Sequence, residues 1–173
     1  NTIRSLFGNQ GQICLCGSRI LIEASVYEKF KSDFIPWAEK LKVGDPLDPE
    51  SKQGAVVSKL HFDKVMSCIQ LAKEEGGKLL LGGKAVVPDG TCKNGFFIEP
   101  TIFENLGQQC RTNTEEVFGP FVTLQPFETV EEAITLANAT NYGLSASIWT
   151  QDISKATLVS SQLQCGIVWI NTW

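Results

Sequence analysis

The chain has 173 residues and carries 15 Lys and Arg against 19 Asp and Glu, which gives a formal net charge of −4. Its 43% hydrophobic and 20% charged residues exclude a disordered chain and are typical of a globular domain with a sizeable core. The acidic balance and the lack of a basic cluster argue against a nucleic-acid partner, and no apolar run reaches the ~20 residues that a membrane span needs.

The N-terminal half contains two predicted amphipathic helices, identified by apolar residues at helical spacing. A capping-box match at Ser25 and Glu28 predicts the start of the first helix, and Pro36 predicts a kink or an early end. The second helix carries an apolar face between Phe62 and Ala72 and should stop at Gly76-Gly77, because glycine commonly ends helices.

Two further helices are predicted in the C-terminal half. Thr129 and Glu132 form another capping box, and Asp152 caps a last helix that runs towards Gly166. Strands that alternate with helices favour an α/β fold with a parallel-rich sheet flanked by helices. The short apolar runs suited to buried strands are residues 19–22, 78–81, 121–124, 145–149 and 167–170.

Six cysteines lie at positions 14, 16, 68, 92, 110 and 165 and could form three disulfides. The chain is large enough to fold without disulfides, and the cysteine spacing is not dense. We therefore expect free thiols in a reducing, cytoplasmic compartment. His61 is the only histidine, which excludes a Cys2His2 zinc site, and no metal site is expected.

Residues 7–19 form a polar, glycine-rich segment around Cys14 and Cys16, directly before a predicted strand. Such a segment lets a substrate approach the backbone and can direct N–H groups at a developing oxyanion, so a reactive cysteine is one interpretation. Two small buried residues in a tight loop, or a metal-binding or redox Cys-x-Cys pair, are the alternatives. Residues 114–120 combine paired acids with Phe-Gly-Pro, and physical reasoning alone gives them no specific role.

Taken together, these segments resemble the aldehyde dehydrogenase superfamily. Residues 7–14 are similar to the cysteine signature of that family, and the likeness continues through Arg19. Later blocks follow in the expected order and extend the resemblance over essentially the whole chain. They are residues 42–46, 95–101, 115–120, 142–144 and 166–171.

The resemblance implies a role for four residues. Cys14 would be the nucleophile that attacks an aldehyde, and its backbone N–H would be one oxyanion donor. Glu116 would bind the nicotinamide ribose of NAD or NADP, and Phe118 would lie beside the nicotinamide. Cys16 matches no catalytic residue and would line the aldehyde pocket. The full-length protein would be a homo-oligomer.

A narrower likeness, carried by Cys14-Leu15-Cys16 and residues 169–173, is to the 2-aminomuconic or 2-hydroxymuconic semialdehyde dehydrogenase branch. It implies an acidic semialdehyde substrate. In the family, the coenzyme loop, the general-base Glu and the oxyanion Asn precede the cysteine signature. We therefore expect residues 1–173 to be a partial catalytic domain that lacks the dinucleotide-binding domain, holds NAD(P) mainly through that missing domain and is inactive alone.

Two other functions are open at this point. Cys14 could act with His61 in a hydrolase, although their separation in sequence says nothing about their distance in the fold. The chain could instead be a truncated, non-catalytic module that only packs or oligomerises.

Overall fold

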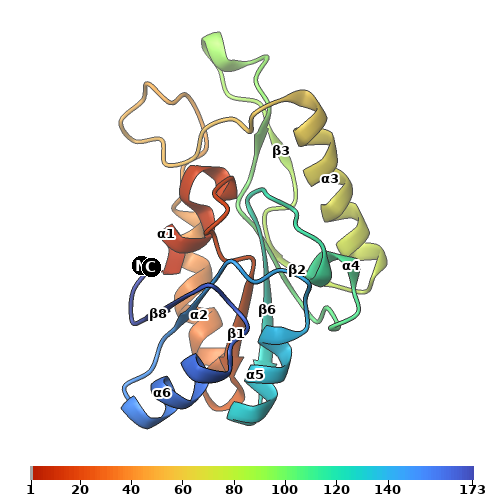
Figure 1. Cartoon of the computed structure of the whole chain (residues 1–173). Helices are drawn as coiled ribbons and strands as arrows, with labels where there is room; N and C mark the ends of the chain where they lie inside the picture. The colour runs from red at the N-terminus through yellow and green to blue at the C-terminus, as the bar shows by residue number, and fades with distance from the viewer. Residues whose placement is uncertain (1) are drawn as a thin grey trace.

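The computed structural model describes residues 2–173, and its centre is a four-stranded sheet in the order β1-β6-β5-β2 (Figure 1). Strands β1 (Arg19–Glu23), β6 (Phe121–Phe127) and β5 (Thr101–Glu104) are parallel. Strand β2 (Lys78–Leu81) pairs antiparallel with β5 at the edge. The predicted α/β fold with a parallel-rich sheet is confirmed, and β2 makes the sheet a mixed one.

Helices cover both faces of this sheet (Figure 1). Helices α1 (Thr2–Phe7) and α2 (Tyr27–Glu39) pack on one face, and α3 (Lys59–Glu74) packs on the other. Successive strand residues point to opposite faces, so Ile102 joins the cluster under α1 and α2 while Phe103 joins the cluster under α3. Both side chains are fully buried.

A smaller layer follows β6. Helix α5 (Val130–Asn138) packs against β1 and β6, and the Arg19 guanidinium donates to the last carbonyls of this helix, those of Leu136 and Ala137, at 2.9 and 3.0 Å. Two more strands, named β7 and β8 below, form a separate parallel pair beside α6. The remaining elements are β3 (Ala85–Val86), β4 (Phe97–Ile98), α4 (Arg111–Thr114), β7 (Ser145–Ile148), α6 (Ile153–Gln162), β8 (Ile167–Ile170) and 3-10 turns at Gly8–Gly11, Ala24–Val26 and Gly90–Cys92.

The predicted capped start of the first helix is wrong, and so is its early end. Helix α2 begins at Tyr27, and Ser25 does not cap it, because the Ser25 hydroxyl donates to the Glu23 carboxylate at 3.0 Å instead. Pro36 does not end the helix early, since α2 continues to Glu39. Pro36 has no backbone N–H to donate to the carbonyl four residues earlier, yet α2 continues for one turn that includes it.

Three other helix ends agree with the sequence. Helix α3 stops before Gly76, whose φ is 88°, and the Gly77 N–H donates to the Ala72 carbonyl at 2.8 Å, as in a Schellman motif. The Asp152 carboxylate accepts from two N–H groups in the first turn of α6, and the Thr129 hydroxyl accepts from the Glu132 N–H. Each of these capping interactions involves residues within about one helical turn of each other, so the local sequence predicts it.

Within residues 2–173, no helix is long and apolar enough to cross a bilayer. The same residues contain no group of three or more His, Cys, Asp or Glu side chains placed to hold a metal ion. All six cysteines are free thiols.

Candidate active site

The two segments that the sequence singles out lead into neighbouring parallel strands. Residues 7–18 precede β1, and residues 114–120 precede β6. Arg19 lies opposite Thr123 in the sheet register, and the Thr123 N–H donates to the Ser18 carbonyl at 2.9 Å. Because parallel neighbours begin at the same edge of a sheet, both segments meet at that edge.

The two segments touch through their backbones at Gly11 and Gly119. A Cβ at Gly11 would lie only 2.1 Å from the Gly119 carbonyl oxygen, and Gly11 has a φ of 69°. The two residues before it, Asn9 and Gln10, also have positive φ values of 47° and 57°. Three consecutive left-handed residues are unusual, and they turn the chain so that the cysteine segment lies directly against residues 116–120.

Cys14 lies in a tight turn on the surface. The Cys16 N–H donates to the Ile13 carbonyl at 2.8 Å, which closes a β-turn with Cys14 in its second position. The Cys14 side chain is exposed, whereas Cys16 is half-buried and its thiol donates to the Gly8 carbonyl at 3.6 Å. Burial raises the pKa of the Cys16 thiol, which disfavours its thiolate. Of the pair, Cys14 is the one open to a substrate.

The cysteine turn is braced from two other parts of the chain. The Val57 N–H donates to the Gln12 side-chain oxygen at 3.0 Å, and the Trp173 indole N–H donates to the Leu15 carbonyl at 2.8 Å. The first bond holds the Gln12 side chain and the second holds the Leu15 backbone, while the Cys14 side chain stays exposed.

The paired acids before β6 differ in their surroundings. Glu115 forms a two-point ion pair with Arg111, with N···O distances of 2.7 and 2.9 Å. The Glu116 side chain is exposed, and its carboxylate makes no hydrogen bond or ion pair with any of residues 2–173. Its backbone is nevertheless held, because the Lys64 ammonium donates to its carbonyl at 2.8 Å and its N–H donates to the Tyr142 hydroxyl at 3.4 Å.

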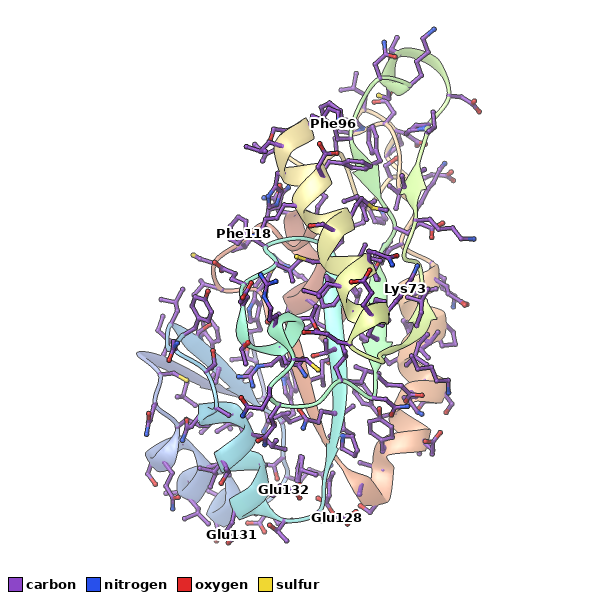
Figure 2. The ribbon with its side chains drawn as sticks, turned by 90° about the vertical axis from the view of Figure 1, so that its right-hand side faces the viewer. Lys73, Phe96, Phe118, Glu128, Glu131 and Glu132 are labelled. Atoms are coloured by element: carbon purple, nitrogen blue, oxygen red, sulfur yellow. The ribbon has the colours of Figure 1, made fainter. Side chains whose placement is uncertain are left out.

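Phe118 lies where the loop before β6 meets the N-terminal segment (Figure 2). Its ring is half-buried and its φ is 58°, a left-handed value that non-glycine residues seldom adopt. The His61 Nε2 lies 2.6 Å from the Phe118 carbonyl oxygen and acts as the donor, because a carbonyl only accepts. The two rings meet edge to face with centroids 6.2 Å apart.

The structure does not form the Cys–His pair of the hydrolase hypothesis. His61 uses Nε2 for the Phe118 carbonyl, and no hydrogen bond links it to Cys14 in the described part of the chain. The sequence offered no reason to select Lys64. Its spacing of three residues from His61 places both side chains on one side of a helix, but the segment that this side meets is not encoded in the spacing.

Comparisons of the sequence with known proteins point to one family. A sequence profile of the aldehyde dehydrogenase family matches residues 1–173. A 2-aminomuconic semialdehyde dehydrogenase of Mus musculus is 41% identical over 99% of this chain and 36% of its own length. Retinal dehydrogenase 2 of Mus musculus is 44% identical over 98% of the chain and 32% of its own length.

Solved structures give the same result. A betaine aldehyde dehydrogenase of Staphylococcus aureus in complex with NAD+ superposes with a TM-score of 0.94 at 40% identity, covering 99% of this chain and 34% of that one. The chain thus spans about a third of the length of the relatives that it matches.

Proposed function

Because the chain belongs to the aldehyde dehydrogenase family, we propose that the full-length protein oxidises an aldehyde to a carboxylic acid with NAD(P)+. The observation that carries this proposal is the backbone contact of Gly11 with Gly119, which brings the turn that exposes Cys14 against the segment of Glu116 and Phe118. Residues 1–173 then form part of the catalytic domain, and the dinucleotide-binding domain belongs to the rest of the full-length protein.

In this proposal Cys14 is the nucleophile. Its thiolate attacks the aldehyde carbon and forms a thiohemiacetal, while the Cys14 backbone N–H donates to the developing oxyanion. NAD(P)+, when bound, supplies the acceptor for the hydride of the thiohemiacetal carbon. Water then hydrolyses the thioester on Cys14, which releases the carboxylic acid and restores the thiol.

Two side chains at the site fit a nicotinamide coenzyme. The exposed Glu116 carboxylate has no partner among residues 2–173, so it can accept hydrogen bonds from the two hydroxyls of a ribose. The half-buried Phe118 ring offers an apolar face for the nicotinamide. The NAD+ complex of the Staphylococcus aureus relative supports NAD as the coenzyme.

We assign the substrate to the acidic, muconic-type semialdehydes. The Cys14-Leu15-Cys16 triplet, residues 169–173 and the similarity to the mouse 2-aminomuconic semialdehyde dehydrogenase support this class. Half-buried Cys16 would line the aldehyde pocket beside Cys14. With the full-length protein, kcat/KM should be higher for an acidic semialdehyde than for retinal or betaine aldehyde. A preference for either neutral or cationic substrate would overturn this class and leave the role of Cys14 untouched.

Substitution of the two cysteines tests the proposed nucleophile. In the full-length protein, Cys14→Ala should lower kcat for NADH formation by at least about 1,000-fold, because the covalent intermediate cannot form. Cys16→Ala, the matched control, should retain the reaction and change mainly the KM for the aldehyde. Progress curves at 340 nm measure both variants. Near-normal NADH formation by Cys14→Ala would show that another group is the nucleophile.

A further inference from the structure

Helix α3 contacts the segment before β6 through the side chain of His61. We propose that His61 is a positioning residue, which holds residues 116–119 in the conformation that receives the coenzyme. The inference rests on the proposed function, because it concerns the same segment. His61 acts through the backbone of Phe118 and is not itself assigned a contact with the substrate or the coenzyme.

The residue lies on a fixed support. Ser58 caps α3, and its hydroxyl accepts from the His61 N–H at 3.2 Å, so His61 belongs to the ordered first turn of the helix. Farther along, α3 is packed on the sheet through Val65 and Ile69, which are 0% and 1% exposed. A hydrogen bond from this turn therefore ties its acceptor to the core of the molecule.

The acceptor is a residue that needs such support. Phe118 has a φ of 58°, and a left-handed conformation costs a non-glycine residue free energy unless its surroundings maintain it. The bond of 2.6 Å from His61 Nε2 fixes the Phe118 carbonyl. The next residue is fixed by the same helix, because a Cβ at Gly119 would lie 2.6 Å from a methyl group of Val65.

This support reaches both halves of the site. Lys64, one turn along α3 from His61, donates to the Glu116 carbonyl at 2.8 Å, so one helix holds both residues proposed to contact the coenzyme. Gly119 in turn touches Gly11 of the cysteine segment. Loss of the His61 donor would free Phe118 to relax, and small displacements of reacting groups lower rates strongly.

The experiment compares three variants of the full-length protein. His61→Leu removes the donor, His61→Gln keeps an amide N–H that can donate to the same carbonyl, and Gln70→Leu changes an exposed residue elsewhere on α3. His61→Leu should raise the Kd and KM for NAD by up to about tenfold, the weight of one hydrogen bond, and change the KM for the aldehyde by less than about twofold. His61→Gln should recover most of the loss, and Gln70→Leu should behave as the parent protein.

A second measurement does not depend on catalysis. Hydrogen exchange of a peptide that spans residues 117–121, in the protein without coenzyme, should be faster in His61→Leu and close to normal in His61→Gln. Unchanged NAD affinity and unchanged exchange in His61→Leu would overturn the inference. The inference would also be overturned if His61→Leu and His61→Gln both lost thermal stability and were impaired to the same extent in every kinetic constant. Failure of the proposed function can be told apart from failure of this inference, because the Cys14→Ala variant would then remain active.

Discussion

Gly11 and Gly8 lie three residues apart in the cysteine segment and face different surroundings. A methyl group on Gly11 would meet the Gly119 carbonyl at 2.1 Å, and its φ of 69° is strained for any residue with a side chain. A methyl group on Gly8 would meet only the ends of Ile13 and Trp173, at 3.7 and 3.9 Å. The same substitution should therefore be strongly unfavourable at Gly11 and nearly neutral at Gly8.

We expect Gly11→Ala to destabilise the protein by at least about 2 kcal/mol, because the backbone strain and the forced separation from Gly119 add together. Gly8→Ala should change the free energy of unfolding by less than about 0.5 kcal/mol. Urea unfolding of the two variants measures both values. Equal effects at the two positions would contradict the close contact of the two segments.

The sequence selected part of the candidate site and missed the rest for identifiable reasons. The motif order indicated Cys14, Glu116 and Phe118, whose roles stay predictions. It did not indicate that Arg111 pairs with Glu115, while the Glu116 carboxylate has no partner among residues 2–173. This ion pair depends on α4, a helix of one turn with no apolar pattern. The donor from His61 was equally hidden, because it joins residues that only the tertiary fold brings together.

At the scale of elements, one carboxylate ties α2 and β2 to the centre of the sheet. Glu104, at the end of β5, is buried and accepts from the Tyr27 hydroxyl at 3.0 Å, from Lys31 at 2.7 Å and from Lys78 at 2.9 Å. Burial raises the pKa of the carboxyl, but the bonds from the two lysines and the tyrosine outweigh burial and lower it to about 2. Burial and the bond to Glu104 raise the pKa of Tyr27.

This network predicts a pH dependence of stability. The pKa of Glu104 is lowered from 4.5 in the unfolded chain to about 2 in the folded protein, so its stabilisation is complete above pH 4.5 and is lost as the pH falls towards 2. Glu104→Gln should lower the urea midpoint at pH 7 and flatten its decline between pH 4.5 and 2. Glu131→Gln, on the exposed side of α5, should leave both unchanged. An undiminished decline in Glu104→Gln would show that other groups cause it.

Prediction of the elements succeeded where the signal was local. All five predicted strands are present, and Gly76 and Asp152 mark helix ends as expected. Strand β5 was missed, although it lies inside the sheet, because Pro100 divides its apolar run and leaves four residues. The antiparallel direction of β2 was missed as well, since the sequence of a strand does not specify the direction of its partner.

At the scale of the whole molecule, the length of the chain limits what it does alone. It spans about a third of the relatives it matches, and the family resemblance implies that the coenzyme loop and the general base precede Cys14 in sequence. We expect the isolated 173-residue chain to form no NADH from an aldehyde and NAD+, while the full-length protein does. Circular dichroism checks that the isolated chain is folded. Measurable NADH formation by this folded chain would contradict its assignment as a partial domain.

The pairing of β1 with β6 also sets the order in which the site can be assembled. Strand β1 has β6 as its partner in the sheet, and the register joins residue 19 to residue 123. During synthesis the cysteine segment therefore emerges long before the strand that fixes it, and helices α2 and α3 are made in between. Closing so long a loop is slow compared with helix formation. We therefore expect the contacts that hold the cysteine segment against β6 to form after the local contacts of helices α2 and α3.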